Sequence, residues 1–153
     1  MKILIAIDGS TYSDDAVQLV IRQFAREATD VRVLHVDEWP KDLSASLTFA
    51  EGPGAATAIL AAHDNRRADA AALVARTVDQ LKRAGFKSTS SAVCDGDARQ
   101  EILDQASAWG ADLVVLGSHG RTGVTRVLLG SVSDSVARHA PCSVVIARHQ
   151  RQA

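Results

Sequence analysis

The sequence contains few cysteines, and their positions exclude the usual cysteine-based sites. Cys94 and Cys142 are the two cysteines of the 153-residue chain, and no CxxC pair occurs. Zinc ligands and redox-active dithiols normally occur in such closely spaced pairs, so neither kind of site is supported. We therefore expect two buried, unreactive thiols. A cytoplasmic location is expected too, because proteins of that compartment rarely need disulfides.

Long hydrophobic runs are also absent. No stretch reaches the roughly 18 consecutive apolar residues of a membrane-spanning helix. The apolar stretch at residues 3–7 is too short for a signal peptide, and no small-residue cleavage site follows it. We expect a protein that neither crosses a membrane nor carries a leader.

Net charge is almost absent as well. The 17 Lys and Arg residues are balanced by 18 Asp and Glu residues, which gives a formal net charge of −1. A surface without a basic excess offers no electrostatic reason to bind nucleic acid or an anionic membrane. The 46% hydrophobic content excludes a disordered chain. We find no repeat, and we expect residues 1–153 to form a single domain.

Strand-like and helix-like segments alternate along the chain. Four short apolar runs and one Ser- and Thr-rich run predict strands at residues 3–7, 31–36, 86–93, 113–116 and 143–147. Such alternation is typical of α/β proteins with right-handed crossovers. We predict a doubly wound, open five-stranded parallel sheet of order 3-2-1-4-5, with helices on both faces.

Helical periodicity predicts a helix between each pair of strands. The first is expected to begin at Ser13 as its N-cap, and the second to extend over about residues 66–84. Asp97 is expected to cap the third helix, and the fourth spans about residues 132–139. Residues 38–65 contain scattered Gly and Pro and are predicted to be a long loop or insertion.

A glycine-rich segment follows the fourth predicted strand. Gly117, Gly120, Gly130 and Ser131 give the spacing G-x-x-G, nine residues, G-S. The free N–H groups at a helix N-terminus attract anions, and glycine lets a phosphate approach closely. The segment lacks the lysine of a P-loop. The alternative is an ordinary strand-to-helix connection, in which Ser131 and Asp134 form a capping box.

The predicted strand order gives a second reason to expect a ligand at this segment. Ligands of doubly wound sheets bind outside the carboxyl ends of the strands, where the strand order reverses. That point lies between the first and fourth predicted strands, which are followed by Asp8 and Gly117. An acidic side chain and a glycine-rich loop are thus expected in one crevice, which favours phosphate binding.

These residues together resemble the universal stress protein family, and specifically its ATP-binding branch. The family's glycine signature is matched in full by the spacing given above. The Ile-Ala-Ile-Asp-Gly-Ser at residues 5–10, the Leu-His-Val at 34–36 and the Gly-Ala-Asp-Leu at 110–113 are also similar to the family. The resemblance covers the chain outside residues 38–65.

The resemblance implies a site for ATP with Mg²⁺ or Mn²⁺. By that resemblance Asp8 lies near the ribose and the metal, and the backbone of Val36 meets the adenine. The loop over the ribose and phosphates is matched by Leu116, Gly117, His119 and Gly120, and the helix start that holds the phosphates by Gly130, Ser131, Val132 and Ser133. No residue is assigned a catalytic role.

We infer a nucleotide-binding regulatory protein of the stress response, with an unidentified protein partner left open. The segment offers a phosphate cradle without a positioned lysine, and His119 has no recognisable orienting partner for base catalysis. Arg121 and Arg126 are candidates to reach the phosphates. Two alternatives stay open: a slow ATPase or phosphotransferase in which Asp8 helps to hold Mg²⁺, and a nucleotide-free interaction module.

The predicted order places the strand at residues 143–147 on an edge of the sheet. Its residues Val144, Val145 and Ile146 are apolar. Proteins normally protect an exposed apolar edge, and two copies can pair such edges across a two-fold axis. The family resemblance also implies homodimers. We predict a homodimer through this strand; the alternative is that residues 38–65 cover the edge within one chain.

Overall fold

One parallel β-sheet forms the centre of the molecule in the computed structural model, which describes residues 1–38, 47, 52, 54–120 and 129–148. Its strands are β1 (Lys2–Ile7), β2 (Asp30–Asp37), β3 (Ser88–Asp95), β4 (Leu113–Gly117) and β5 (Ser143–Ala147). They follow the order β3-β2-β1-β4-β5, and every neighbouring pair is parallel. The predicted sheet and its strand order are therefore confirmed.

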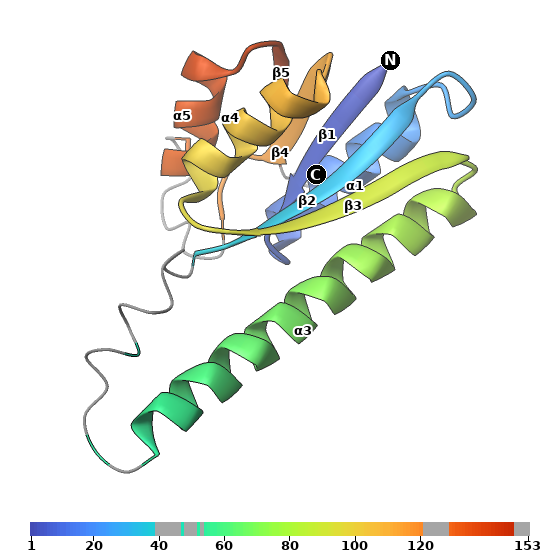
Figure 1. Cartoon of the computed structure of the whole chain (residues 1–153). Coiled ribbons are helices and arrows are strands. Elements are labelled where there is room, and N and C mark those ends of the chain that lie inside the picture. The colour runs from blue at the N-terminus through green and yellow to red at the C-terminus, as the bar shows by residue number, and fades with distance from the viewer. Residues whose placement is uncertain (39–46, 48–51, 53, 121–128, 149–153) are drawn as a thin grey trace, which may run out of the picture.

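Helices cover both faces of the sheet (Figure 1). One face packs against α1 (Thr11–Gln23) and α3 (Ala55–Arg83), and the other against α4 (Ala98–Trp109) and α5 (Ser131–His139). Successive side chains of a strand point to opposite faces, so each strand supplies both cores. In β1, Ile3 and Ile5 pack on the α1 and α3 side, whereas Leu4 packs on the α4 and α5 side.

The start of α1 differs from the prediction. Ser10, and not Ser13, is the N-cap: its side chain accepts a hydrogen bond from the Ser13 N–H at 3.2 Å. Ser13 lies in the first turn, where it is buried and its hydroxyl donates to the Ser10 carbonyl at 2.9 Å. Both residues are serines, and which of them caps α1 depends on where the chain leaves β1.

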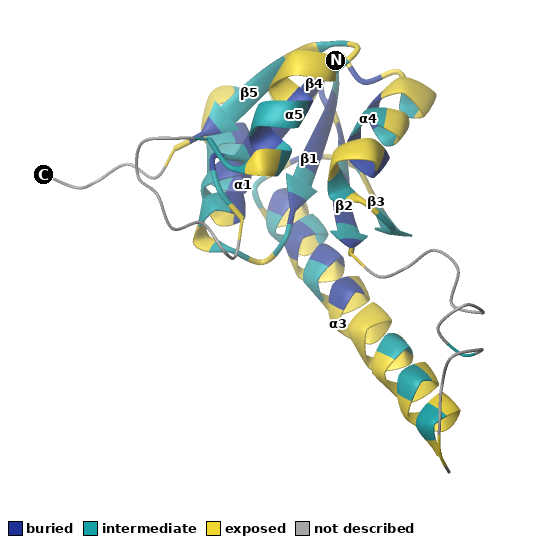
Figure 2. Ribbon diagram, turned by 90° about the vertical axis from the view of Figure 1, so that its left-hand side faces the viewer, coloured by how far each residue is buried: buried dark blue, intermediate teal, exposed yellow. Residues whose placement is uncertain are grey.

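The start of α3 also differs from the prediction, because the helix begins at Ala55 and not near Arg66. The prediction followed apolar periodicity, which begins only at Ala70 and continues through Val74, Val78 and Leu81, the part of α3 that packs on the sheet. Residues 55–62 are mostly alanine, the residue with the highest helix propensity, and they form helix without a buried stripe. Figure 2 shows the N-terminal part of α3 extending beyond the sheet with its surface largely exposed. Of the predicted long loop, residues 39–46, 48–51 and 53 lie outside the described residues.

The two cysteines are free thiols, as expected, but each is half-buried and not fully buried. Cys94 lies in β3 and Cys142 directly precedes β5. Burial raises the pKa of the Cys142 thiol, which keeps it in its unreactive protonated form. Within the described parts of the chain, no helix is long and apolar enough to cross a membrane.

Candidate functional site

A cavity of about 250 Å³ opens at the carboxyl ends of β1, β2 and β4. This is the place where the strand order reverses, because β1 lies between β2 and β4. The ten residues that the resemblance assigned to the nucleotide all line it: Asp8, Val36, Leu116, Gly117, His119, Gly120, Gly130, Ser131, Val132 and Ser133. The fold thus brings together residues from both ends of the chain.

The N-terminus of α5 forms one wall of this cavity. Gly130 is the N-cap, and no side chain caps the helix, so the alternative capping box of Ser131 and Asp134 is not formed. The Asp134 N–H bonds the Gly130 carbonyl at 2.9 Å, and its carboxylate pairs with Arg138. The first-turn N–H groups of Ser131 and Val132 therefore carry the positive end of the helix dipole to the cavity.

Ser133 lies in the same turn, but its side chain points inward. It is 2% exposed, and its hydroxyl oxygen is 2.9 Å from the carbonyls of both Ser118 and Gly130. The Gly130 N–H donates to the same Ser118 carbonyl at 2.8 Å. The Ser133 hydroxyl is thus engaged within the protein, which leaves the backbone as the part that could meet a ligand.

Asp8 combines a structural contact with a place in the cavity. Its Oδ1 accepts hydrogen bonds from the N–H of Ser10 at 2.9 Å and from the Ser10 hydroxyl at 2.6 Å. These bonds shape the turn between β1 and α1. A Cβ added at Gly120 would come within 3.1 Å of the other carboxylate oxygen, Oδ2. The glycine therefore leaves room beside the carboxylate.

Gly117 has a packing role that the sequence did not reveal. A Cβ at this position would lie 2.6 Å from the carbonyl carbon and oxygen of Tyr12, in the first turn of α1. Real Cβ atoms do not approach backbone atoms so closely, so the end of β4 can meet α1 only through a glycine. The phosphate-loop interpretation had given this glycine only its place beside the ligand.

The two histidines near the cavity have different surroundings. His35 is buried, and its Nδ1 lies 2.9 Å from the Ile7 carbonyl, so it is a hydrogen-bonded core residue. His119 lines the cavity; its Nδ1 lies 3.1 Å from the Ser118 hydroxyl, and its ring packs 5.1 Å from that of Tyr12. Its Nε2 is buried without a hydrogen-bond partner among the described residues. No carboxylate contact that would orient it as a base is present there.

Sequence reasoning missed several lining residues, among them Glu38, Ala98 and Ile102. Ala98 and Ile102 are on α4, and only the packing of that helix over β2 brings them to the site. The charged carboxylates of the described lining are Asp8 and Glu38, and this lining contains no Lys or Arg. The predicted phosphate contacts Arg121 and Arg126 lie outside the described residues.

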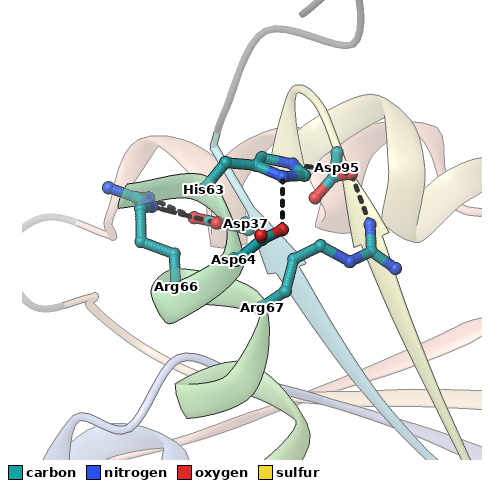
Figure 3. A network of polar contacts seen from close by, with 6 residues as sticks. All are labelled: Asp37, His63, Asp64, Arg66, Arg67 and Asp95. Carbon is teal, nitrogen blue, oxygen red and sulfur yellow. Dashed lines mark hydrogen bonds and ion pairs between the residues drawn. The ribbon is translucent and has the colours of Figure 1, made fainter. Parts of the chain in front are cut away.

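A polar network lies behind the cavity, on the opposite side of β2 (Figure 3). Asp37 stands between Val36 and Glu38, which line the cavity, but its own side chain turns toward α3. Its buried carboxylate accepts hydrogen bonds from Arg66, including bonds of 3.0 Å from Nε to each oxygen. Asp37 raises the pKa of Arg66 by this contact.

The same network includes His63. Its Nε2 lies 3.7 Å from Oδ2 of Asp95 at the end of β3, and Arg67 donates to that oxygen at 2.8 Å. No group of three or more possible metal ligands occurs among the described residues. We therefore interpret the cluster as the anchor that holds α3 to the ends of β2 and β3. Apart from the charges, no sequence pattern pointed to it.

Comparison with known proteins gives a family. The model of the universal stress protein family matches residues 1–148. The curated universal stress protein Sll1388 of Synechocystis is 33% identical over an alignment of 158 positions, which covers 97% of each chain.

Solved structures agree on the fold. Universal stress protein UspA from Lactobacillus plantarum has a TM-score of 0.80 and 22% identity, with 97% of each chain covered. A universal stress protein in complex with cAMP has a TM-score of 0.68 and 22% identity, covering 97% of this chain and 96% of the other. An Arabidopsis thaliana family member with AMP bound has a TM-score of 0.64 and 16% identity, covering 99% and 93%. The extent of the family match and the identity to a curated relative show that this chain belongs to the universal stress protein family.

Proposed function

We propose that this protein binds an adenine nucleotide, ATP with Mg²⁺ or Mn²⁺, and acts in the stress response as a nucleotide-dependent regulator. One observation carries the proposal: the uncapped N-terminus of α5 opens into a cavity at the switch point of the sheet. The structural neighbours with cAMP and AMP support an adenine nucleotide as the ligand class. The proposal takes residues 1–153 as one functional domain in the cytoplasm.

The lining suits the different parts of a nucleotide. Leu34, Val36 and Ile102 provide apolar surface for a base, as small-molecule cavities generally do. The N–H groups of Ser131 and Val132 provide donors for phosphate oxygens at the positive end of a helix. With these residues, backbone amides and not lysine side chains would hold the phosphates.

A divalent cation fits this site only together with the nucleotide. The described lining carries the carboxylates of Asp8 and Glu38 and no Lys or Arg to balance polyphosphate charge. Mg²⁺ is commonly bound by one or two carboxylates plus substrate phosphates. Asp8 is the carboxylate next to Gly120: a Cβ added at that glycine would lie 3.1 Å from its Oδ2. We expect Asp8→Asn to weaken ATP binding in Mg²⁺ and not to weaken it in EDTA, where the substitution only removes a negative charge that repels the phosphates.

The test of the proposal removes one backbone donor and keeps the helix. Ser131 is the first residue of α5, a position where proline is tolerated because its N–H has no intrahelical partner. Gly130 before it is extended at φ −64° and ψ 156°, as a residue preceding proline should be. Ser131→Pro should therefore fold normally and lack the backbone phosphate donor together with the Ser131 hydroxyl. Isothermal titration should show ATP binding weakened by about tenfold or more, since hydrogen bonds to charged groups contribute about 1.5–3 kcal/mol.

Two further variants make the result specific. Thr11→Pro makes the same change at the first residue of α1, which is exposed and lies outside the cavity lining, so it should bind ATP as the wild type does. Ser131→Ala removes the hydroxyl but keeps the N–H, so it should bind more tightly than Ser131→Pro. Equal affinity of Ser131→Pro and wild type would contradict the assignment of the phosphates to α5.

The proposal includes a homodimer formed through β5. The sheet order leaves β5 at an edge, and Val144, Val145 and Ile146 are only half-buried in the single chain. An edge of this kind is suited to pairing with a second copy across a two-fold axis.

A further inference from the structure

We propose that Ser133 is a positioning residue: its buried hydroxyl fixes the first turn of α5 against the end of β4, and this hydroxyl does not itself contact the ligand. This inference rests on the proposed nucleotide site, to which it adds the way the phosphate donors are held. It concerns a cluster of backbone and hydroxyl groups formed by Ser118, Gly130 and Ser133, which we call the Ser118 clamp.

The geometry of the clamp is centred on one carbonyl. The Ser118 carbonyl accepts the Gly130 N–H at 2.8 Å and lies 2.9 Å from the Ser133 hydroxyl. The same hydroxyl lies 2.9 Å from the Gly130 carbonyl. A hydroxyl has a single proton, so it donates to either carbonyl or is shared between them. Ser118 and Ser133 are 4% and 2% exposed, so water cannot replace these bonds.

The clamp closes the glycine-rich segment at its two ends. Ser118 follows β4 and Gly130 precedes α5, so their hydrogen bond joins the residues that flank the sequence segment 119–129. On the other side, the Ser118 N–H donates to the Ala147 carbonyl of β5 at 2.9 Å. The start of α5 is therefore tied to the sheet by hydrogen bonds among described residues.

This tie matters because backbone donors cannot adjust independently. The N–H groups of Ser131 and Val132 point where the first turn points, and donors that are already oriented lose less entropy when an anion binds. The space around Gly130 agrees with a tight fit: a Cβ there would lie 3.3 Å from the Ser118 carbonyl oxygen and from the Cα of His119. A glycine at the cap and a small hydroxyl residue at Ser133 together allow this close packing.

The first experiment tests the clamp without a ligand. Ser133→Ala removes the hydroxyl from a small buried residue, so the variant should fold. Because a typical hydrogen bond contributes about 1 kcal/mol, amide exchange at Gly130, followed by NMR, should become roughly fivefold faster. Ser135→Ala, the same change on the next turn of α5, should leave exchange at Gly130 unchanged. Unchanged exchange in Ser133→Ala would overturn the clamp.

The second experiment separates positioning from general support of the cavity. Titrations with adenosine, AMP and ATP in the presence of Mg²⁺ compare ligands that differ only in their phosphates. Ser133→Ala should bind AMP and ATP roughly fivefold more weakly and adenosine as tightly as the wild type. An equal loss for all three ligands would mean that Ser133 supports the whole cavity, and would overturn the positioning role.

The outcomes also distinguish this inference from the proposed function. A wild type that binds neither AMP nor ATP would overturn the proposed function, and with it the use of the clamp. Normal binding of AMP and ATP by Ser133→Ala, beside a wild type that binds them, would overturn the positioning role alone.

Discussion

At the scale of single residues, the glycines of one sequence signature make different demands on the structure. Gly117 is required by packing, because a Cβ there would meet backbone atoms of Tyr12 at 2.6 Å. Gly120 is exposed, and a Cβ there would meet only Oδ2 of Asp8, at 3.1 Å. A shared motif therefore does not imply a shared role.

This difference predicts that two alanine substitutions affect different properties, one the stability of the fold and the other the binding of the ligand. Gly117→Ala should lower the free energy of unfolding by about 1–3 kcal/mol, as overpacking generally does, because neither α1 nor β4 can yield without repacking. Gly120→Ala should leave stability nearly unchanged and weaken the binding of Mg²⁺ and ATP, since it crowds Asp8. Urea unfolding and isothermal titration of both variants measure the two effects. Equal destabilisation by the two substitutions would contradict this division of roles.

At the scale of elements, α4 is capped by a side chain in the way that the sequence predicted. The Asp97 carboxylate accepts from the N–H groups of Arg99 and Gln100, and the Arg99 guanidinium donates to it as well. The hydrogen bond from the Arg99 side chain is the main cause that lowers the pKa of Asp97 from 3.8 to about 2. A cap of this kind makes the stability of α4 dependent on pH.

We expect this dependence to be visible in the unfolding free energy. Since the folded pKa is lowered, the carboxylate stabilises the protein above 3.8 and loses its effect as the pH falls toward about 2. Asp97→Ala should cost about 1 kcal/mol near neutral pH, and the difference from wild type should shrink across that acid range. Asp97→Asn keeps the cap without the charge and should cost less. A difference between Asp97→Ala and wild type that is independent of pH would contradict the assignment.

The same scale includes the anchoring of α3. Asp37 is the buried partner of Arg66, and its neighbours Val36 and Glu38 line the cavity on the other side of β2. Asp37→Asn should destabilise the protein by about 1 kcal/mol, a modest figure because Arg66 is 44% exposed. Amide exchange should rise in the first turns of α3 and not in α5. Arg138→Gln breaks an exposed pair within α5 and serves as the control, for which no change in α3 is expected.

At the scale of the whole molecule, the edge strand β5 gives the test of assembly. Val145 packs on the core beside α1, so a charged residue there would disturb the fold as well as the edge. The Ala147 carbonyl bonds toward the β4 side, and backbone groups alternate along a strand, so the Val144 N–H points outward. Val144→Pro therefore removes an edge donor without removing a bond to β4.

We expect light scattering to find a dimer for the wild type and a monomer for Val144→Pro, with unchanged circular dichroism. Val145→Pro would remove an inward N–H and should lower stability instead, which makes it the matched control. A monomeric wild type, or a Val144→Pro variant that remains dimeric at equal concentration, would remove β5 from the interface.

The sequence alone determined the features that depend on local pattern. Apolar runs located the strands, and Asp97 marked the start of α4. Alternation with right-handed crossovers limited the possible topologies, and the simplest doubly wound order is the one observed. Asp8 and the signature residues Gly117, Gly120, Gly130 and Ser131 were predictable for the same reason, whereas the other predicted cavity residues came from the family resemblance. A switch point follows from strand order, and the ends of β1 and β4 can be read directly from the chain.

Only the tertiary structure decided how those residues are used. Ser10 rather than Ser13 caps α1, because the cap is set by the point at which the chain leaves β1. The helix α3 starts at Ala55, because alanine's helix propensity extends the helix beyond its buried part. The packing role of Gly117 and the inward hydroxyl of Ser133 depend on neighbours that are distant in sequence. Contacts between residues that are distant in sequence are set by how the helices and strands pack, and the pattern of residue types does not show them.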